Sequence, residues 1–385
     1  MEQMLNSQAK RLQQGAIRAM FEKAAAYSNT INLGIGEPDM ATPEVIVSAG
    51  CEALKSGHTH YTPNAGIPEL RREVAESLKK EGIHRNPDSE ILITSGGMGA
   101  LSLALMVLLE QGDEVLIQDP QWLNYYAQVT FFGGVPIPVP VEEINDFRIT
   151  AKAIEQSVTP RTKVLMLNSP NNPTGAVLDR EDLEAIAKVA VKHNLIVLSD
   201  EVYSTLVYDE ARHISIATLE GMQERTVVIN SFSKAFAMTG WRVGYAAGNR
   251  HIIDKMIRLQ ENLVACVNSA AQYAAITALQ HPELAEEMQK GYREKRDLVV
   301  DGLNRIKGLS CIRPRGSFYV FANIQEVGMD EITFANELLE KQQVVLIPGS
   351  AFGDKGKGYV RISYANSVEN LTDALARIDR YTSEK

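Results

Sequence analysis

The feature that most constrains this chain is a repeated alternation of short apolar runs with segments of helical period. The apolar runs cover residues 91–94, 114–118, 163–167, 195–199 and 226–230, and helical patterns cover 100–109 and 180–193. Strands that alternate with helices in this way are typical of a mainly parallel sheet covered by helices. We therefore expect the α/β fold class. In such sheets, ligands bind beyond the carboxyl ends of the strands.

The last hundred residues follow a different pattern. A long charged helix runs through 292–303, short strands are expected at 318–321 and 359–364, and a helix closes the chain. The chain has 385 residues, more than the roughly 250–300 at which a single core stops growing. We expect a large domain at 46–284 and a smaller α+β domain formed by 1–45 together with 285–385.

Composition excludes several classes of protein. The formal charge is −9 without a long basic run, which argues against a nucleic-acid surface. No apolar run reaches the roughly 18 residues of a membrane helix, and the polar N-terminus MEQMLNSQAKRLQQ does not read as a signal peptide. Cys51, Cys266 and Cys311 match neither a metal spacing nor a disulfide framework and indicate a reducing compartment. We expect a soluble cytoplasmic protein without a metal.

A lysine follows the expected strand 226–230, in Ser231-Phe232-Ser233-Lys234-Ala235. Burial and nearby positive charge deprotonate a lysine, and a neutral lysine forms a Schiff base with an aldehyde. The hydroxyls of Ser231 and Ser233 and the guanidinium of Arg242 are suited to a phosphate. For Lys234 taken alone, an ordinary surface lysine is the simpler interpretation.

Three further polar residues follow expected strands. Asp200 closes 195–199, where its carboxylate would keep a pyridine nitrogen protonated or else cap a helix. Tyr203 would lie one turn later if a helix begins there, as a donor to a ring hydroxyl or as a structural tyrosine. Asn172 lies in the loop 168–175, which two prolines and a glycine make rigid, or which is a plain turn.

A glycine-rich segment and a tryptophan complete the set. Gly97, Met98 and Gly99 open a helix after the strand 91–94, where small residues let a phosphate approach backbone N–H groups. Trp122 would stack on a flat ring, although a lone tryptophan is more often part of a core. Together these residues supply every group that a phosphorylated pyridine aldehyde needs.

Several segments resemble class I/II aminotransferases of the fold-type I pyridoxal 5′-phosphate superfamily. They are SFSKAFAMTGWRVGY, NSPNNPTG, SDEVY and HYTPNAGIPEL, and the likeness extends from INLGIGEPD at 31–39 to YVRISYANS at 359–367. The resemblance implies that pyridoxal phosphate is the cofactor and that Lys234 carries it. It further implies a phosphate site at Arg242, Ser231 and the backbone of 97–99, a pyridine partner in Asp200, O3′ donors in Tyr203 and Asn172, and ring stacking by Trp122.

The substrate side rests on Arg361. In Val360-Arg361-Ile362-Ser363, strand alternation sends this arginine to the face opposite its neighbours. A guanidinium clamps a carboxylate through two parallel hydrogen bonds, although an exposed strand arginine is the simpler alternative. The resemblance makes Arg361 the α-carboxylate ligand, helped by the Gly36 backbone, Asn172 and Trp122. It also implies that Tyr61 reaches the phosphate of a neighbouring subunit, and hence a homodimer with shared active sites.

The resemblance implies ping-pong transfer of an amino group from an L-amino acid to a 2-oxo acid such as 2-oxoglutarate. The freed Lys234 amine would be the base that moves the Cα proton. Relatives selective for acidic substrates often carry lysine where this chain has Met98. We therefore expect aromatic or other neutral donors to be preferred over aspartate, unless Met98 packs in the core.

Two alternatives stay open. A β-lyase of the same fold would share every cofactor residue, and only the release of pyruvate and ammonia would distinguish it. An aminotransferase-like regulatory protein would need a DNA-binding domain ahead of INLGIGEPD. About thirty residues without basic character precede that segment.

Overall fold

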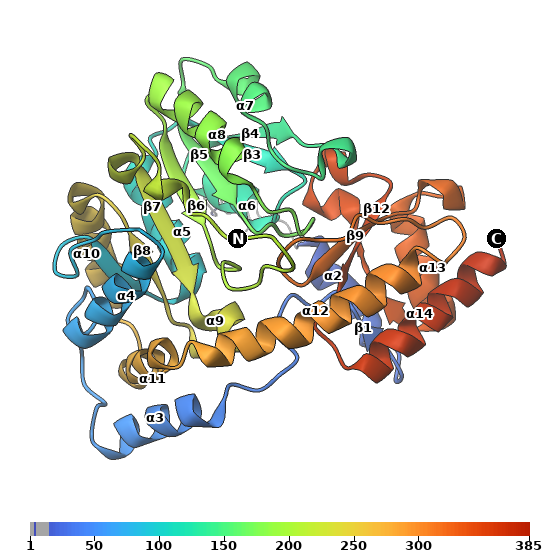
Figure 1. The fold of residues 1–385 in the computed structure, drawn as a ribbon, viewed down its shortest axis with the longest axis horizontal. Helices are drawn as coiled ribbons and strands as arrows, with labels where there is room; N and C mark the ends of the chain where they lie inside the picture. The colour runs from blue at the N-terminus through green and yellow to red at the C-terminus, as the bar shows by residue number, and fades with distance from the viewer. Residues whose placement is uncertain (1–3, 5–14) are drawn as a thin grey trace.

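The computed structural model describes residue 4 and residues 15–385, so the polar segment 1–14 lies outside the described residues except for residue 4. The helices and strands form two groups, each built around its own sheet. One surrounds a seven-stranded sheet, and the other surrounds a small antiparallel sheet (Figure 1). None of the helices in the described part of the chain is long and apolar enough to cross a membrane.

The seven-stranded sheet confirms the expected α/β class. In spatial order its strands are β2 (Ile91–Thr94), β8 (Gly244–Ala247), β7 (Thr226–Ser231), β6 (Ile196–Asp200), β5 (Thr162–Asn168), β3 (Glu114–Asp119) and β4 (Val135–Pro140). The pairs from β7 to β4 are parallel, and β8 is antiparallel to both of its neighbours. The sheet is therefore mainly parallel.

Side chains of the central strands alternate between the two faces of the sheet. In β5, Val164 and Met166 pack into the core that holds α5 (Gly96–Leu108) and α10 (Arg250–Val264). Leu165 and Leu167 pack into the opposite core, with α8 (Arg180–Lys192). Helices on both faces explain why these strands read as continuous apolar runs.

The other helices of this group are α3 (Glu44–Lys55), α4 (Pro68–Lys80), α6 (Asn124–Phe131), α7 (Ala151–Ser157), α9 (Phe232–Ala235) and α11 (Ser269–Gln280). The glycine-rich segment opens a helix, as expected, because α5 begins at Gly96 and the segment forms its first turn. The helical pattern at 100–109 therefore missed only this first turn. The helix on which the placement of Tyr203 depended does not form, because residues 202–205 form turns, and Tyr203 does not lie one helical turn after Asp200.

Two strands of the seven-stranded sheet were not apparent from sequence. Strand β4 reads VPIPVP, and its prolines are tolerated because it pairs only with β3 at the edge of the sheet. Strand β8 reads GYAA, and its small residues resemble neither an apolar run nor an alternation.

The second group contains β9 (Tyr319–Asn323), β11 (Ile347–Pro348) and β12 (Tyr359–Ser363) in one sheet, and β1 (Ile31–Asn32) paired with β10 (Val344–Val345). Its helices are α2 (Ala16–Ala24), α12 (Glu283–Leu303), α13 (Glu331–Gln342) and α14 (Val368–Ser383). Ile31 and Leu33 share one core with α12, β9, β12 and α14. The domain division at 46 and 285 stays a prediction.

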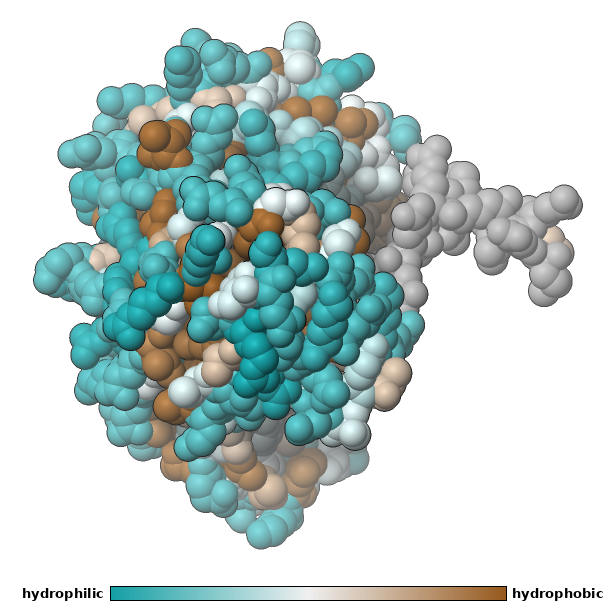
Figure 2. Space-filling model, turned by 90° about the vertical axis from the view of Figure 1, so that its right-hand side faces the viewer, coloured by the Kyte–Doolittle hydropathy of each residue, from teal (hydrophilic) through white to brown (hydrophobic). Residues whose placement is uncertain are grey.

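Helix α14 shows how this group separates polar from apolar side chains. Its Leu371, Ala374, Ile378 and Tyr381 are buried in the core. The face of the molecule at this end is mainly hydrophilic, with hydrophobic side chains visible between the polar ones (Figure 2).

Candidate active site

A cavity of about 950 Å³ lies where the carboxyl ends of β5, β6 and β7 face the second group of elements. It brings together most of the residues that the sequence singled out. These are Gly36, Gly97, Met98, Trp122, Asn172, Asp200, Tyr203, Ser231, Ser233, Lys234, Arg242 and Arg361. Gly99 and Tyr61 are not among the lining residues.

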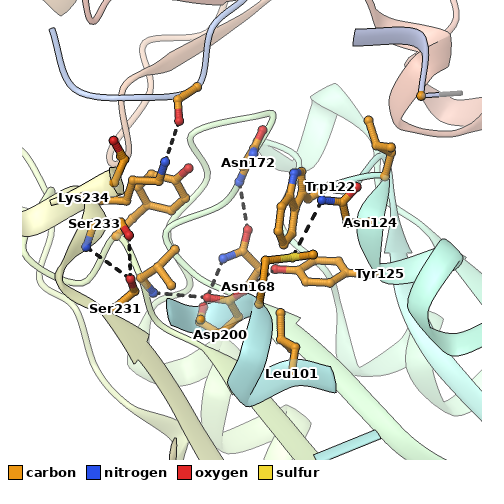
Figure 3. A pocket seen from close by; sticks show the side chains of 18 of the residues that line it. Leu101, Trp122, Asn124, Tyr125, Asn168, Asn172, Asp200, Ser231, Ser233 and Lys234 are labelled. Atoms are coloured by element: carbon orange, nitrogen blue, oxygen red, sulfur yellow. Dashed lines mark hydrogen bonds between the residues drawn. The ribbon is translucent and has the colours of Figure 1, made fainter. Parts of the chain in front are cut away.

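Lys234 extends from α9, directly after β7, and its Nζ donates a hydrogen bond of 2.5 Å to the carbonyl oxygen of Gly36 (Figure 3). Burial lowers the pKa of Lys234 to about 8, Glu37 opposes this shift, and the positive charge of Arg361 adds to it. A substantial fraction of the amine is therefore neutral near physiological pH, as a nucleophile or base requires.

Asp200 ends β6 and is 2% exposed. Burial raises the pKa of its carboxyl group to about 6, and hydrogen bonds from the Tyr125 hydroxyl and the Val202 amide limit the rise. Tyr125 Oη lies 2.7 Å from Asp200 Oδ2 (Figure 3). Asp200 is therefore mainly ionised at neutral pH, as a partner for a protonated ring nitrogen must be.

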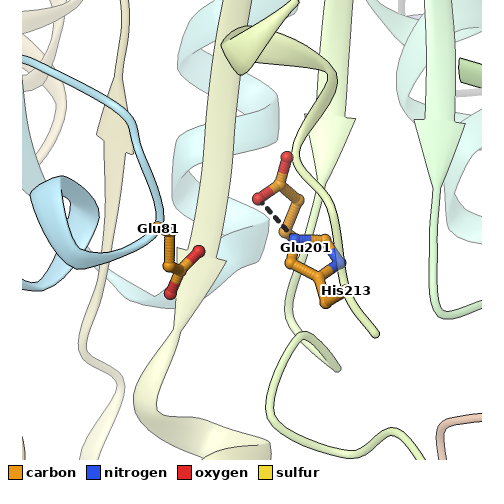
Figure 4. Close-up of side chains that lie close together, drawn as sticks. All are labelled: Glu81, Glu201 and His213. Carbon is orange, nitrogen blue, oxygen red and sulfur yellow. Dashed lines mark hydrogen bonds and ion pairs between the residues drawn. The ribbon is translucent and has the colours of Figure 1, made fainter. Parts of the chain in front are cut away.

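The next residue, Glu201, anchors the chain on the side away from the cavity. Its Oε1 accepts hydrogen bonds from Ser199 at 2.7 Å and Ser215 at 2.6 Å, and its Oε2 lies 2.9 Å from Nε2 of His213 (Figure 4). Glu81 brings a second carboxylate to within 4.8 Å of this pair. The buried anchor at Glu201 fixes the strand end that carries Asp200.

Hydroxyls, a guanidinium and bare backbone form one end of the cavity. Ser231 Oγ donates to Ser233 Oγ over 2.9 Å. A Cβ atom placed on Gly96 would lie 2.5 Å from Nη2 of Arg242, so the guanidinium packs against backbone that only glycine leaves free. Gly97 lines the cavity, whereas a Cβ on Gly99 would meet Ser95 instead.

Arg361 lies on β12 at the opposite side and is 2% exposed. Its guanidinium donates to Asn172 Oδ1 at 2.9 Å and to the Gly34 carbonyl at 2.6 Å, while Nε is buried without a partner. Within the described ranges, no carboxylate pairs with Arg361. The group is thus a buried cation that faces a cavity and has no counter-ion.

Met98 and Trp122 form part of an apolar wall. Met98 is 36% exposed and lines the cavity, so the alternative that it packs in the core is wrong. Its sulfur accepts a hydrogen bond from Nε2 of Gln128 at 3.2 Å. Trp122 stands edge-to-face with Tyr125, with ring centroids 5.3 Å apart. Both side chains are therefore available to a ligand.

Tyr61 lies in the loop between α3 and α4, outside the cavity, and is 88% exposed. An aromatic side chain this exposed makes little contact within its own chain. Its assignment to a neighbouring subunit stays a prediction.

Sequence reasoning missed several lining residues. Tyr125 follows Trp122 by three residues, a spacing that places both on one side of the helix start, and this signal was available. Tyr319 stands in an ordinary apolar strand and gave no signal. Phe21 and Arg18 come from α2, whose position over the cavity depends on tertiary packing.

Comparison with known proteins identifies the family. Residues 28–378 match the family described as aminotransferase class I and II. The chain is 45% identical over 373 residues to aromatic-amino-acid aminotransferase 2 of Thermococcus litoralis and 46% identical over 373 residues to an aspartate aminotransferase of Pyrococcus abyssi, covering 96% of each chain. The solved structure of Thermus thermophilus aspartate aminotransferase with maleate superimposes with a TM-score of 0.93 at 39% identity, over 98% of this chain and 99% of that one. The chain therefore belongs to the class I and II aminotransferases, as its motifs predicted, and is an enzyme that transfers amino groups.

Proposed function

We propose that this enzyme binds pyridoxal 5′-phosphate in the cavity and moves an amino group from an L-amino acid to a 2-oxo acid. The observation that carries the proposal is Arg361. A buried guanidinium without a counter-ion is unfavourable, so the cavity calls for an anionic ligand. The α-carboxylate of an amino acid satisfies Arg361 and brings its amino group toward Lys234.

The donor set of the cavity fits pyridoxal phosphate. A partly neutral amine suits the aldehyde, a buried carboxylate suits the ring nitrogen, and Trp122 suits the ring face. The hydroxyls of Ser231 and Ser233 and the guanidinium of Arg242 suit the phosphate. When bound, this group supplies an aldehyde that takes up the amino group and a ring that accepts the electrons released at Cα.

The protein residues then have separate tasks. Asp200, ionised at neutral pH and oriented by Tyr125, holds the ring nitrogen in its protonated form. Tyr203 and Asn172 hold the ring oxygen. Lys234 takes the proton from the substrate Cα, and its lowered pKa suits it to accept and return that proton near neutral pH.

The substrate end favours a neutral side chain. Arg361 and Asn172 bind the α-carboxylate with the Gly36 backbone beside them, and the wall beyond carries Met98 and Trp122. A flexible thioether beside an aromatic ring suits aromatic or other neutral donors better than aspartate. Relatives named for aromatic amino acids and for aspartate are nearly equally similar, and 2-oxoglutarate is the acceptor we propose.

We also propose a homodimer with shared active sites, in the cytoplasm. Tyr61 supports the dimer, as do exposed apolar side chains such as Leu54 at 53% and Leu263 at 55%. The cysteines at 51, 266 and 311 are free, in keeping with a reducing compartment. The net charge of −9 is in keeping with the absence of a nucleic-acid partner.

The decisive experiment measures oxo-acid formation from a panel of amino donors with 2-oxoglutarate. In parallel, borohydride treatment of the yellow holoenzyme and peptide mapping locate the bound cofactor. We expect oxo acid and glutamate in equal amounts, and the label on the peptide that contains Lys234. Release of pyruvate and ammonia without glutamate, or a label on another lysine, contradicts the proposal.

A further inference from the structure

The guanidinium of Arg361 packs over two aromatic rings. Its central carbon is 4.4 Å from the ring centroid of Tyr319 and 4.8 Å from that of Phe352. Cation–π contact with both rings partly compensates a charge that has no carboxylate partner in the described part of the chain. The two rings also fix the plane of the guanidinium, and with it the direction from which a carboxylate can approach.

Tyr319 has a second contact that Phe352 lacks. Its hydroxyl oxygen lies 3.0 Å from that of Tyr203, with the two rings edge-to-face. Burial raises the pKa of both phenols, well above the ordinary value for Tyr203, so both stay protonated. Gly36 leaves the space for this arrangement, because a Cβ atom there would lie 2.4 Å from the Tyr319 hydroxyl.

The number of protons decides which of the two hydroxyls donates the hydrogen bond. Each phenol has one proton, so only one hydroxyl can donate to the other. If Tyr203 donates toward the ring oxygen of the cofactor, its own oxygen must be the acceptor in the pair. Tyr319 is then the donor, and its hydrogen bond strengthens the one that Tyr203 makes.

We propose that Tyr319 is a positioning residue that couples the carboxylate clamp at Arg361 to the phenol of Tyr203. The proposal rests on the function proposed above for Arg361 and Tyr203. Tyr319 itself contacts neither the reacting carbon nor the reacting nitrogen in this scheme. It links the residue that recognises the substrate to a residue that holds the cofactor.

The charge of Arg361 determines how strongly Tyr319 donates to Tyr203. Burial raises the pKa of Tyr319, and the positive charge of Arg361 opposes that rise, which makes Tyr319 a stronger donor. A substrate carboxylate on Arg361 neutralises the charge and weakens the donation to Tyr203. The ring oxygen of the cofactor therefore senses whether the carboxylate site is occupied.

The test uses three holoenzyme variants. Tyr319→Phe keeps the ring beside Arg361 and removes only the hydroxyl. Phe352→Leu is the matched control, because it removes the other ring and touches no hydroxyl. Tyr203→Phe, alone and combined with Tyr319→Phe, closes a double-mutant cycle. The visible absorption of each holoenzyme is measured as a function of pH, and the midpoint of the absorption change is determined. The measurement is repeated with maleate or 3-phenylpropionate, two carboxylates that have no amino group to transfer, and the change in midpoint is called the displacement.

We expect these carboxylates to displace the titration midpoint of the wild-type absorption. Tyr319→Phe should lose at least about half of that displacement while its Kd for the carboxylate changes less than about threefold. Phe352→Leu should weaken carboxylate binding by about tenfold and keep the displacement. In the Tyr203→Phe background, the second change should have no further effect on the displacement.

A displacement in Tyr319→Phe equal to that of the wild type overturns the inference, as does equal loss in Phe352→Leu. Additive effects of the changes at 203 and 319 overturn it as well. Failure of the proposed function gives a different result. In that case the wild-type protein takes up no pyridoxal phosphate, or maleate and 3-phenylpropionate do not bind to it.

Discussion

Burial in one cavity shifts the pKa values of Lys234 and Asp200 in opposite directions, and each shift favours the neutral form of the group. Burial lowers the pKa of the lysine to about 8 and raises that of the aspartic acid to about 6. The same physical cause acts on both, because a low dielectric penalises whichever form is charged. Toward the upper of these two values, Asp200 is ionised and a substantial part of the Lys234 amine is neutral, as their proposed tasks require.

The lowered pKa of Lys234 predicts how cofactor uptake depends on pH. The neutral fraction of the amine rises with pH until it levels off above about 8. The rate at which apo-enzyme captures pyridoxal phosphate should therefore rise about tenfold per pH unit below that value and then become constant. Stopped-flow absorbance measures this rate, and Lys234→Arg is the control that should show no capture. A rate still rising steeply at pH 10 would mean that the cavity does not depress this pKa.

Met98 predicts donor preference. Aromatic or other neutral donors should show higher kcat/KM than aspartate, and Met98→Lys should raise kcat/KM for aspartate about tenfold, because a distal carboxylate gains a cationic partner. Met98→Leu is the apolar control and should leave aspartate unchanged. Cofactor content and Tm are measured for both variants. Aspartate as the best donor of the unmodified enzyme would contradict the first half of this prediction.

Residues at strand ends could be predicted from sequence, whereas their partners could not. Lys234, Asp200 and Asn172 each follow an apolar run, and a parallel sheet necessarily brings such ends to one edge. Tyr319 lies inside a strand that reads as core, and only the tertiary contact of its hydroxyl with Tyr203 brings it to the cavity. Such contacts depend on long-range geometry that local patterns do not encode.

At the scale of elements, helix α2 brings charge to a largely apolar wall. Arg18 and Glu22 both line the cavity and form an ion pair of 3.4 Å one turn apart. Among the described residues, the other cations that line the cavity are Lys234, Arg242 and Arg361, and each already has a proposed task. Arg18 is therefore the cation best placed to meet a second carboxylate.

This position of Arg18 predicts a selective loss. Arg18→Met should lower kcat/KM for 2-oxoglutarate and aspartate by about 1.5-fold to fivefold, the range expected for an exposed ion pair, and leave aromatic donors unchanged. The effect should shrink as salt is added. Arg72→Met removes another exposed, paired arginine on α4 and should change neither substrate class. Equal losses for both classes in Arg18→Met would show a structural role for the helix instead.

At the scale of the whole molecule, Tyr61 predicts that two inactive chains restore each other. Tyr61→Ala and Lys234→Ala should both be inactive as pure proteins. When the two are unfolded together and refolded, half of the dimers are hybrids, and one of the two sites in each hybrid is intact. About a quarter of the wild-type activity should therefore return. Sedimentation checks that the mixture is dimeric, and a fully active monomer would refute the shared site.

The cavity lies between two parts of the chain to which we assign different tasks. In the proposed function, the reaction depends on the edge of the seven-stranded sheet, and the choice of substrate depends on the small sheet, α2 and Met98. In an evolving family with this arrangement, substitutions in a helix or a loop can change the substrate while the reaction stays the same. Relatives of nearly equal similarity bear the names of different amino acids, which is in keeping with this separation.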